Sequence, residues 1–306
     1  MVDRFSIILK GIFILATYLT LILSVKYVES DEYYQGEYYF LMLCSLLGAV
    51  IIASSRDLLI LFIGIELASG PMFLLSGWKK RSPESNEGAI KFFLLGVLSA
   101  ALILYGFSLL YGLTGQILFD NIASLLASNN SSAANLAIIL VLAGIGFKIS
   151  AVPFHMWAPD VYQGSPTSVT IFFAVLPKIA ALTVFIRFLY IPFVNMIDQW
   201  QMIIVFLSIA SMLFGAIAAI GQKNLKRLIA YSSIGHMGYA LAGLSVGSNE
   251  GIQSAISYIS IYLVMNLAFF SCLFMIRKSE NYFENIEDLA GLSKNHPILS
   301  ISLMIV

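Results

Sequence analysis

The sequence predicts an all-α polytopic membrane protein, a helix bundle that crosses the bilayer about nine times. Hydrophobic residues fill 59% of its 306 positions and charged residues only 11%, whereas roughly 25% of the residues in an ordinary soluble domain are charged. The apolar residues are also gathered into stretches of about 20, the length that a helix needs to cross a bilayer. Composition and segment length therefore agree on an integral membrane protein.

The expected membrane helices follow one another with short connections. They cover residues 6–25, 39–54, 57–77, 89–113, 135–154, 166–190, 200–221, 226–247 and 252–276. A further helix opens at Pro297, and the residues up to Val306 are too few to cross a bilayer. The first stretch has a basic start but no small-residue cleavage site after it, so we interpret it as a membrane helix and not as a signal peptide.

Basic residues are concentrated in alternate loops. If each stretch crosses once, the loops after the first, third, seventh and ninth helices share one side, and they carry Lys26, Lys79, Lys80, Arg81, Lys223, Lys226, Arg227, Arg277, Lys278 and Lys294. The other side has only Arg4, Lys10, Arg56 and Arg187. The positive-inside bias then places the lysine-rich side in the cytoplasm or the mitochondrial matrix.

Several function classes have no support in the composition. The formal net charge is zero, so nothing indicates a nucleic-acid partner, and lipids are the expected surroundings. The two cysteines lie in apolar runs, and the spacing of the three histidines matches no metal site. We therefore expect neither a metal nor a redox cofactor in this chain.

Glu66, Lys148 and Lys178 lie near the middle of apolar stretches. A charged side chain at the centre of a membrane helix costs roughly 2.5 to 3.5 kcal/mol, so it normally pairs with another charge or lines a wet cavity. Glu66 is either half of an ion pair that only fixes helix packing or a carboxylate that exchanges protons. The lysines either snorkel to the headgroups or exchange protons, and we favour proton exchange for all three residues.

The segment from Lys148 to Lys178 is the most irregular part of the sequence. It contains the prolines Pro153, Pro159, Pro166 and Pro177, and each interior proline removes a helix hydrogen bond. We therefore predict broken helices here. In transporters such breaks border the path of the ion or substrate.

Three further residues are weaker candidates. Lys91 sits early in its stretch, where snorkelling and proton loading are equally plausible. His155 and His236 can relay protons, although a lone buried histidine is more often a satisfied hydrogen-bonding group. Ser232, Ser233 and Tyr239 add hydroxyls near His236.

Two other polar stretches are interpreted as structural. Segment 277–296 is predicted to be a polar, partly helical surface connector. The basic side chains of Lys223, Lys226 and Arg227 are predicted to anchor the chain at the membrane interface.

Long motifs in the chain resemble the antiporter-like subunits of respiratory complex I. The most specific is residues 147–170, FKISAVPFHMWAPDVYQGSPTSVT, followed at 177–180 by PKIA. Residues 226–239, KRLIAYSSIGHMGY, and 63–67, IGIEL, also fit, and the likeness runs from about residue 39 to 306.

The resemblance implies an antiporter-like bundle of two inverted repeats, each with a broken helix and a buried lysine. Residues 1–38 would form a first helix and an acidic loop, 39–190 one repeat with Glu66, Lys148 and Lys178, and 191–306 the incomplete start of the second. The family's next buried lysine would fall after Val306. The chain is then expected to be truncated, or to be the product of a split gene with a second polypeptide that carries the remaining C-terminal helices.

The resemblance further implies a proton-translocating membrane-arm subunit of complex I, working beside other membrane-arm subunits. Lys148 would load from the inner side through Lys91 and water, Glu66 would modulate it, and Lys178 would pass protons laterally. NADH, FMN, iron-sulfur clusters and ubiquinone would belong to other subunits. The expected location is the mitochondrial inner membrane, with a bacterial plasma membrane or thylakoid as alternatives. A subunit of a multi-subunit cation/proton antiporter, or a pump-derived assembly scaffold, stays open as another function.

Overall fold

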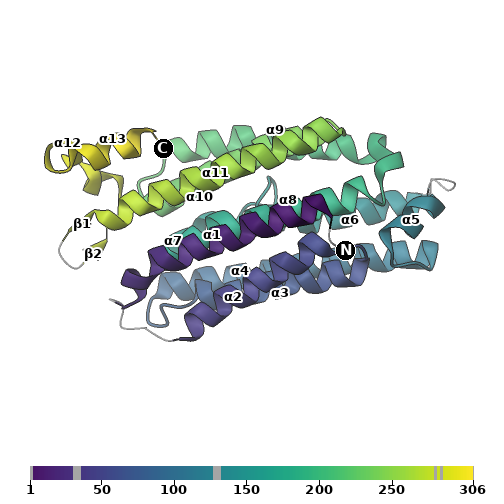
Figure 1. Cartoon of the computed structure of the whole chain (residues 1–306), viewed down its shortest axis with the longest axis horizontal. Coiled ribbons are helices and arrows are strands. Elements are labelled where there is room, and N and C mark those ends of the chain that lie inside the picture. Colours follow the sequence, from purple (N-terminus) through teal and green to yellow (C-terminus); the bar gives the residue numbers. More distant parts are fainter. Residues whose placement is uncertain (1–2, 30–35, 127–131, 279–280, 283–284, 306) are drawn as a thin grey trace.

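Long helices running nearly parallel and antiparallel form one elongated bundle (Figure 1). The computed structural model describes residues 3–29, 36–126, 132–278, 281–282 and 285–305. The long helices among them are α1 (Arg4–Glu29), α2 (Glu37–Ser54), α3 (Leu58–Ser76), α4 (Pro83–Thr114), α6 (Ser132–Ile149), α8 (Thr167–Tyr190), α9 (Ile197–Ile220), α10 (Leu225–Ser245) and α11 (Asn249–Met275). The predicted fold class is confirmed.

Shorter elements connect the long helices. They are α5 (Phe119–Leu126), α7 (Trp157–Gly164), the 3-10 turn η1 (Val194–Met196), the antiparallel strand pair β1 (Arg277–Lys278) and β2 (Asn281–Tyr282), η2 (Ile286–Leu289), α12 (Leu292–Asn295) and α13 (Pro297–Ile305). The connector after α11 was expected to be polar and partly helical. It is so from η2 onward, but it starts with a short hairpin.

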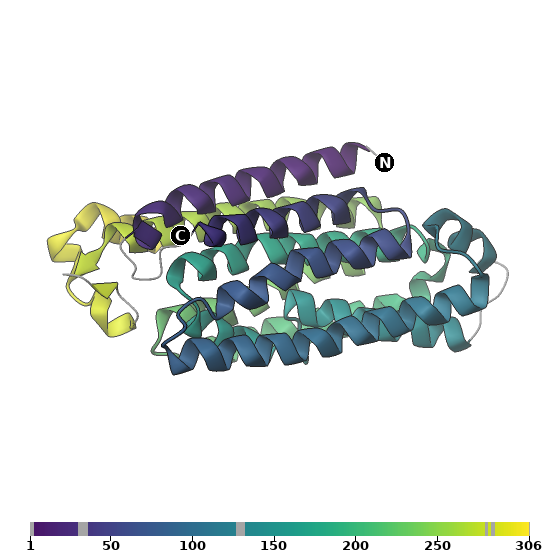
Figure 2. The same ribbon diagram turned by 90° about the horizontal axis from the view of Figure 1, so that it is seen from below.

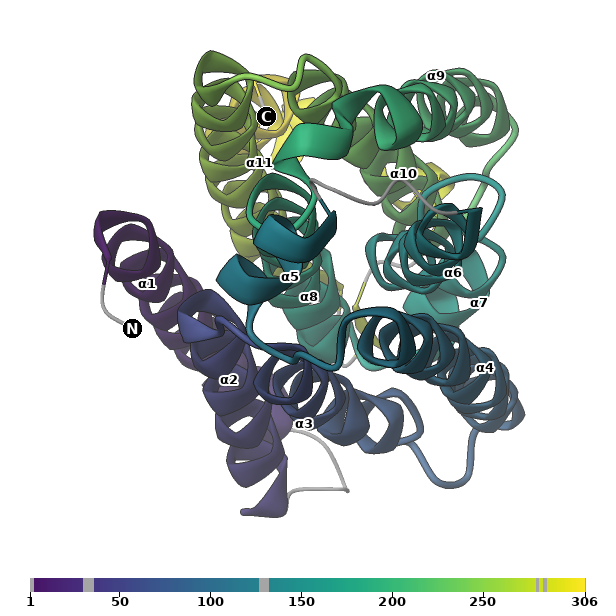
Figure 3. The same ribbon diagram turned by 90° about the vertical axis from the view of Figure 1, so that its right-hand side faces the viewer.

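Helix α8 lies at the centre of the bundle (Figure 3), with α1, α2, α6, α10 and α11 packed around it. Its side chains are buried almost without exception from Thr167 to Leu189. Figure 2 shows α1 and α4 on opposite flanks, where many of their apolar side chains face outward. A helix that is apolar all round fits the middle of a membrane bundle, and outward apolar faces fit contact with lipid.

Helix ends are satisfied locally, as a bilayer requires of every backbone group. Asp57 accepts from the Ile60 N–H at the start of α3, and Asn224 accepts from the Arg227 N–H at the start of α10. Ser82 caps α4, whose first residue is Pro83. At the other end of α4, Gly115 takes the left-handed conformation with φ 65°, which glycine adopts without steric cost.

Each of the nine expected membrane stretches corresponds to a helix, with two corrections. The helix expected over 135–154 ends at Ile149, because the chain turns at Ser150 and Pro153 cannot continue it. The helix expected from residue 89 starts at Pro83. Eight of the described helices are long and apolar enough to cross a membrane. The ninth, α10, carries Lys226, Arg227 and His236, which lower its hydropathy.

The loops that were expected to share a side do meet at one end of the bundle. There the Tyr27 hydroxyl accepts from the Thr167 N–H, and Asn224 forms a bridge with Asn285. At the opposite end Asp57 forms a bridge with Leu118. The alternation behind the positive-inside argument therefore agrees with the fold. The side chains of Lys26, Arg277 and Lys278 lie outside the described part.

Candidate functional site at the broken helix

The chain breaks between α6 and α7, at residues 150–156, which begin at the buried Ser150 and end at the exposed Met156. Ser150 has φ 57°, and the Ala151 N–H donates to the Gly146 carbonyl at 2.9 Å. The Trp157 indole N–H reaches back to the Phe147 carbonyl at 2.8 Å, so the two half-helices are tied across the break. The predicted broken helix is thus confirmed, and it ends one residue after Lys148.

Lys148 reaches from α6 to α3. Its ammonium donates to the Ser69 hydroxyl at 2.9 Å and lies 3.4 Å from a Glu66 carboxylate oxygen. The Lys148 side chain is 12% exposed and that of Glu66 is 34% exposed. The structure therefore brings the two predicted residues together, and Ser69 is the nearer partner. Pro71 removes a backbone hydrogen bond just beyond them in α3.

A cavity of about 40 Å³ lies between Lys148 and α8. Its polar lining comes from Lys148 and Ser69, and its far wall from Trp157 and the α8 residues Pro177 and Ala181. A space of about 10 to 15 Å³ can hold a water molecule. There is thus room for water between the Lys148 ammonium and the helix that carries Lys178.

Lys178 is completely buried. Its ammonium donates to the Ile149 carbonyl at 3.0 Å and to the Ser150 hydroxyl, and it lies 5.4 Å from the centre of the Trp157 ring. No ion pair among the described residues includes Lys178. Instead it caps the carbonyl end of α6, where the helix dipole favours a cation. Snorkelling to the headgroups does not fit a side chain that ends inside the break.

Asp160 on α7 holds together two cations from different helices. It pairs with Lys91 of α4 at 2.7 Å and with Arg227 of α10 at 2.7 Å, and Lys91 also pairs with Glu87 at 2.7 Å. Close packing makes this possible, because a Cβ at Gly88 would lie 3.2 Å from the Asp160 carbonyl oxygen and one at Gly164 only 2.4 Å from that of Glu84. Lys91 is therefore held at the lysine-rich end by Asp160 and Glu87.

The two candidate histidines lie in different places. His155 is in the break and packs against Phe214 of α9, with ring centres 4.4 Å apart, and its buried Nδ1 has no hydrogen-bond partner in the described part of the chain. His236 lies on α10, where its Nδ1 is 2.7 Å from the Tyr258 hydroxyl. It borders a cavity of about 320 Å³ between α10, α11 and α13. Neither histidine is joined to Lys148 or Lys178 by a hydrogen bond among the described residues.

Sequence reasoning missed several members of the site. Neither Ser69 nor Asp160 was among the candidate residues. Lys226, expected to be an interface anchor, is 4% exposed and donates to the Ser165 carbonyl at the end of α7. Arg227, expected to be another, pairs with Asp160. One signal in the sequence could have identified Asp160. It is a carboxylate among prolines in a membrane segment, and such a charge needs a partner.

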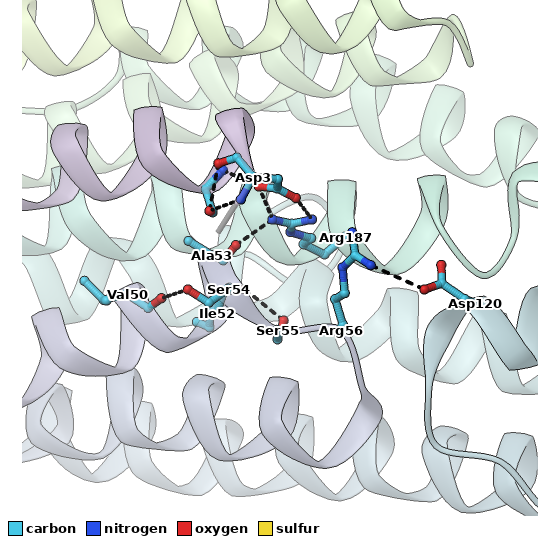
Figure 4. A network of polar contacts seen from close by, with 10 residues as sticks. Asp3, Val50, Ile52, Ala53, Ser54, Ser55, Arg56, Asp120 and Arg187 are labelled. Atoms are coloured by element: carbon cyan, nitrogen blue, oxygen red, sulfur yellow. Dashed lines mark hydrogen bonds and ion pairs between the residues drawn. The ribbon is translucent and has the colours of Figure 1, made fainter. Parts of the chain in front are cut away.

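The opposite end of α8 is fixed by a second polar network (Figure 4). The Arg187 guanidinium makes two hydrogen bonds to the Asp3 carboxylate, at 2.8 and 2.9 Å, and a third to the Ala53 carbonyl at 2.7 Å. Burial raises the pKa of Asp3, but the hydrogen bonds from Arg187 and from the Ser6 N–H outweigh this effect and lower the pKa to about 2. Nearby, Arg56 pairs with Asp120 of α5 at 3.5 Å.

Comparison with known proteins decides the family. The family described as NADH:quinone oxidoreductase/Mrp antiporter, transmembrane region, matches residues 55–306. The chain belongs to this family. NADH-quinone oxidoreductase subunit N of Pelagibacter ubique is 59% identical over 305 residues, which are 100% of this chain and 64% of that protein. The chain thus spans about 64% of the length of this family member.

Solved structures contain chains with the same fold. A chain in respiratory complex I from Thermus thermophilus is 33% identical, with a TM-score of 0.79 over 98% of this chain and 63% of that one. A chain of the Mrp complex from Dietzia shares the fold, with a TM-score of 0.87 at 24% identity, over 99% of this chain and 56% of that one. Among the described residues no three His, Cys, Asp or Glu side chains gather as metal ligands.

Proposed function

We propose that the chain is a proton-translocating membrane-arm subunit of respiratory complex I. The observation that carries this proposal is the pair of lysines at the break of α6, one beside a carboxylate and one completely buried without a counter-ion among the residues that the structure describes. Buried ionisable groups in a membrane bundle are costly, and they mark ion paths. The family includes both complex I subunits and Mrp antiporters. Identities of 59% to an NADH-quinone oxidoreductase subunit and 33% to a complex I chain, against 24% to the Mrp chain, favour the complex I function.

The geometry suggests an order of proton transfer. The Asp160–Lys91 pair lies at the lysine-rich end of the bundle, where protons would enter from the inner side. The Lys148 ammonium can give a proton to water in the adjacent cavity, and Glu66 and Ser69 stabilise its charged form. Lys178 would receive the proton next to the Ile149 carbonyl. Electron transfer from NADH to quinone would occur in other subunits.

Glu66 supports an interaction with a neighbouring subunit. Its carboxylate is 34% exposed on α3 when the chain is considered alone, and a carboxylate facing lipid at mid-membrane is unfavourable. Another membrane-arm subunit packed against α3 would shield it. Because the relatives are longer than this chain, we include further helices in the proposal, supplied by the rest of a longer chain or by a second polypeptide.

We place the protein in a bacterial plasma membrane. The relatives with complex I names come from bacteria, which favours this location over the mitochondrial inner membrane.

We also propose that residues 39–190 and 191–306 are two related repeats. In their support, a Cβ at Gly48 of α2 would lie 2.3 Å from the Ala68 nitrogen of α3, and one at Gly215 of α9 would lie 2.6 Å from the Gly235 nitrogen of α10. The pairs α2–α3 and α9–α10 thus both make a close approach at a glycine.

Native electrophoresis of membranes that carry a tagged form of the chain tests the assignment. Co-migration of the tag with NADH dehydrogenase activity supports a complex I subunit. Migration in a complex without that activity, together with sodium/proton exchange by the isolated complex, would instead indicate the antiporter.

A further inference from the structure

Two phenol groups are buried without a partner between α7, α10 and α11. Tyr162 of α7 is completely buried, and Tyr262 of α11 is 3% exposed. Neither hydroxyl oxygen makes a hydrogen bond of ordinary geometry with a described residue, although Ser233 lies near both of them and Asn266 lies near that of Tyr262. A buried hydroxyl without a partner is costly, and bound water is the common way to satisfy it.

A third hydroxyl lies beside both phenols. Ser233 of α10 is buried, and its side chain is close enough to interact with both Tyr162 and Tyr262. It donates to the Ala230 carbonyl at 2.7 Å, so its lone pairs are free to accept a hydrogen bond from a phenol or from water. The three hydroxyls therefore form a polar cluster in an apolar interior.

This cluster lies between the buried lysine and the histidine of α10. The Lys178 ammonium is 6.0 Å from the centre of the Tyr162 ring. On the other side, the rings of Tyr262 and His236 have centres 5.1 Å apart, and His236 is one helical turn beyond Ser233. The cavity of about 320 Å³ is lined by Ser233, Tyr262 and His236 themselves, together with Ser232 and Asn266. Polar side chains thus recur at short intervals from the break of α6 to the cavity beside α10, with gaps that bound water would have to bridge.

We propose that Tyr162, Ser233 and Tyr262, with water bound between the phenols, carry protons from Lys178 to His236. This inference rests on the proposed proton-pumping function. An ammonium proton of Lys178 passes to the first oxygen, and each hydroxyl or water accepts one proton and releases its own to the next oxygen. The last proton reaches the His236 imidazole, so that Lys178 ends as a neutral amine and His236 as an imidazolium. The phenols never become phenolates, which fits their ordinary pKa of about 10.

Substitutions that remove only an oxygen test this bridge in the assembled complex. Tyr162→Phe, Ser233→Ala and Tyr262→Phe should each lower NADH-driven proton uptake by membrane vesicles about threefold to tenfold, the factor expected from one lost hydrogen bond in a transfer step. Electron transfer from NADH to ferricyanide should stay unchanged. Because the groups act in series, their losses should not multiply. The double variant Tyr162→Phe/Ser233→Ala should pump at most about twofold more slowly than the single variant with the larger defect.

Ser208→Ala is the matched control. Ser208 is buried and donates to the Gly238 carbonyl at 2.8 Å, as Ser233 does to that of Ala230, but it lies on α9 away from the phenols. Pumping should survive this change. An equal loss in Ser208→Ala and Ser233→Ala would overturn the bridge, because it would trace the effect to packing.

Two further outcomes separate this inference from the proposed function. Normal pumping in Tyr162→Phe and Ser233→Ala, with pumping lost in Lys178→Ala, would overturn the bridge alone. Normal pumping in Lys178→Ala as well would count against both the bridge and the proposed pumping function. Should the variants fail to assemble, a map of the unaltered complex that resolves water decides: water bonded to the Tyr162 and Tyr262 oxygens supports the bridge, and a dry gap overturns it.

Discussion

The Lys178 ammonium donates to the carbonyl of Ile149, 3.0 Å away, and Ile149 directly follows Lys148 in the chain. The two lysines are therefore coupled through one peptide unit at the end of α6. A movement of the break that releases the Ile149 carbonyl changes the surroundings of both. The partial negative charge at a helix C-terminus contributes typically 0.3 to 1 kcal/mol to a cation placed there.

Ser150 offers a test of this arrangement that separates chemistry from backbone strain. Ser150→Ala and Ser150→Gly both remove the hydroxyl that binds Lys178, so both should reduce proton pumping by the same factor. The φ of 57° suits glycine better than alanine, so the alanine variant should be about 1 to 2 kcal/mol less stable. Thermal unfolding of the purified complex measures the second effect. A pumping defect in the alanine variant alone would show that the hydroxyl is irrelevant.

Asp160 should contribute more to stability than either of its partners. Asp160→Asn weakens the contacts to Lys91 and Arg227 together, whereas Arg227→Gln leaves the Lys91 pair in place. We expect a loss of about 1 to 2 kcal/mol for Asp160→Asn, less than for a fully buried pair because the groups are about a third exposed. The loss should be smaller for Arg227→Gln. Denaturation curves of the two variants give the comparison, and equal losses would contradict the shared role of Asp160.

Gly164 should tolerate no side chain. A Cβ there would lie 2.4 Å from the Glu84 carbonyl oxygen, a backbone atom that cannot swing away. Gly164→Ala should therefore destabilise the complex by about 1 to 3 kcal/mol, the usual cost of overpacking, and displace α7 from α4. Gly112→Ala is the control, since a Cβ at Gly112 meets nothing within 4 Å. Equal thermal stability of both variants would show that α7 does not pack as described.

The Asp3–Arg187 pair gives a pH dependence of defined sign. The pKa of Asp3 is about 2 in the folded chain, below its ordinary value of 3.8. A carboxyl whose pKa falls on folding stabilises the fold above its unfolded pKa and loses that contribution as the pH drops through the folded pKa. The difference in melting temperature between the unaltered complex and Asp3→Asn should be constant above about pH 5 and shrink toward pH 2. A difference that grows on acidification would contradict the pair.

The membrane helices and the three central charges were predictable from the sequence because both rest on local signals. A run of about 20 apolar residues predicts a helix in any context, and Glu66, Lys148 and Lys178 interrupt such runs. For Lys148 and Glu66, the sequence predicted that each needs a partner of opposite charge, but not which side chain lies nearest. That Ser69 is the nearer partner depends on how α3 is rotated against α6, which no local pattern encodes.

Other parts of the site depend on contacts between distant segments. Asp160, Lys91 and Arg227 meet because α4 and α10 begin, and α7 ends, at the same side of the bundle. Lys226 has the sequence signature of an interface anchor, yet the end of α7 covers it. The proline-rich segment predicted a break, but Pro177 is accommodated inside a continuous α8. Proline alone therefore located the irregular region without fixing the residue at which the helix ends.

Proton pumping by variants of the two central lysines tests the account most directly. The measurement is NADH-driven acidification of inside-out membrane vesicles that carry Lys148→Ala or Lys178→Ala, with NADH–ferricyanide reduction as the control for the redox subunits. The account predicts that both variants lose most of their pumping and keep the ferricyanide activity. Full pumping in both variants, with normal assembly, would contradict it.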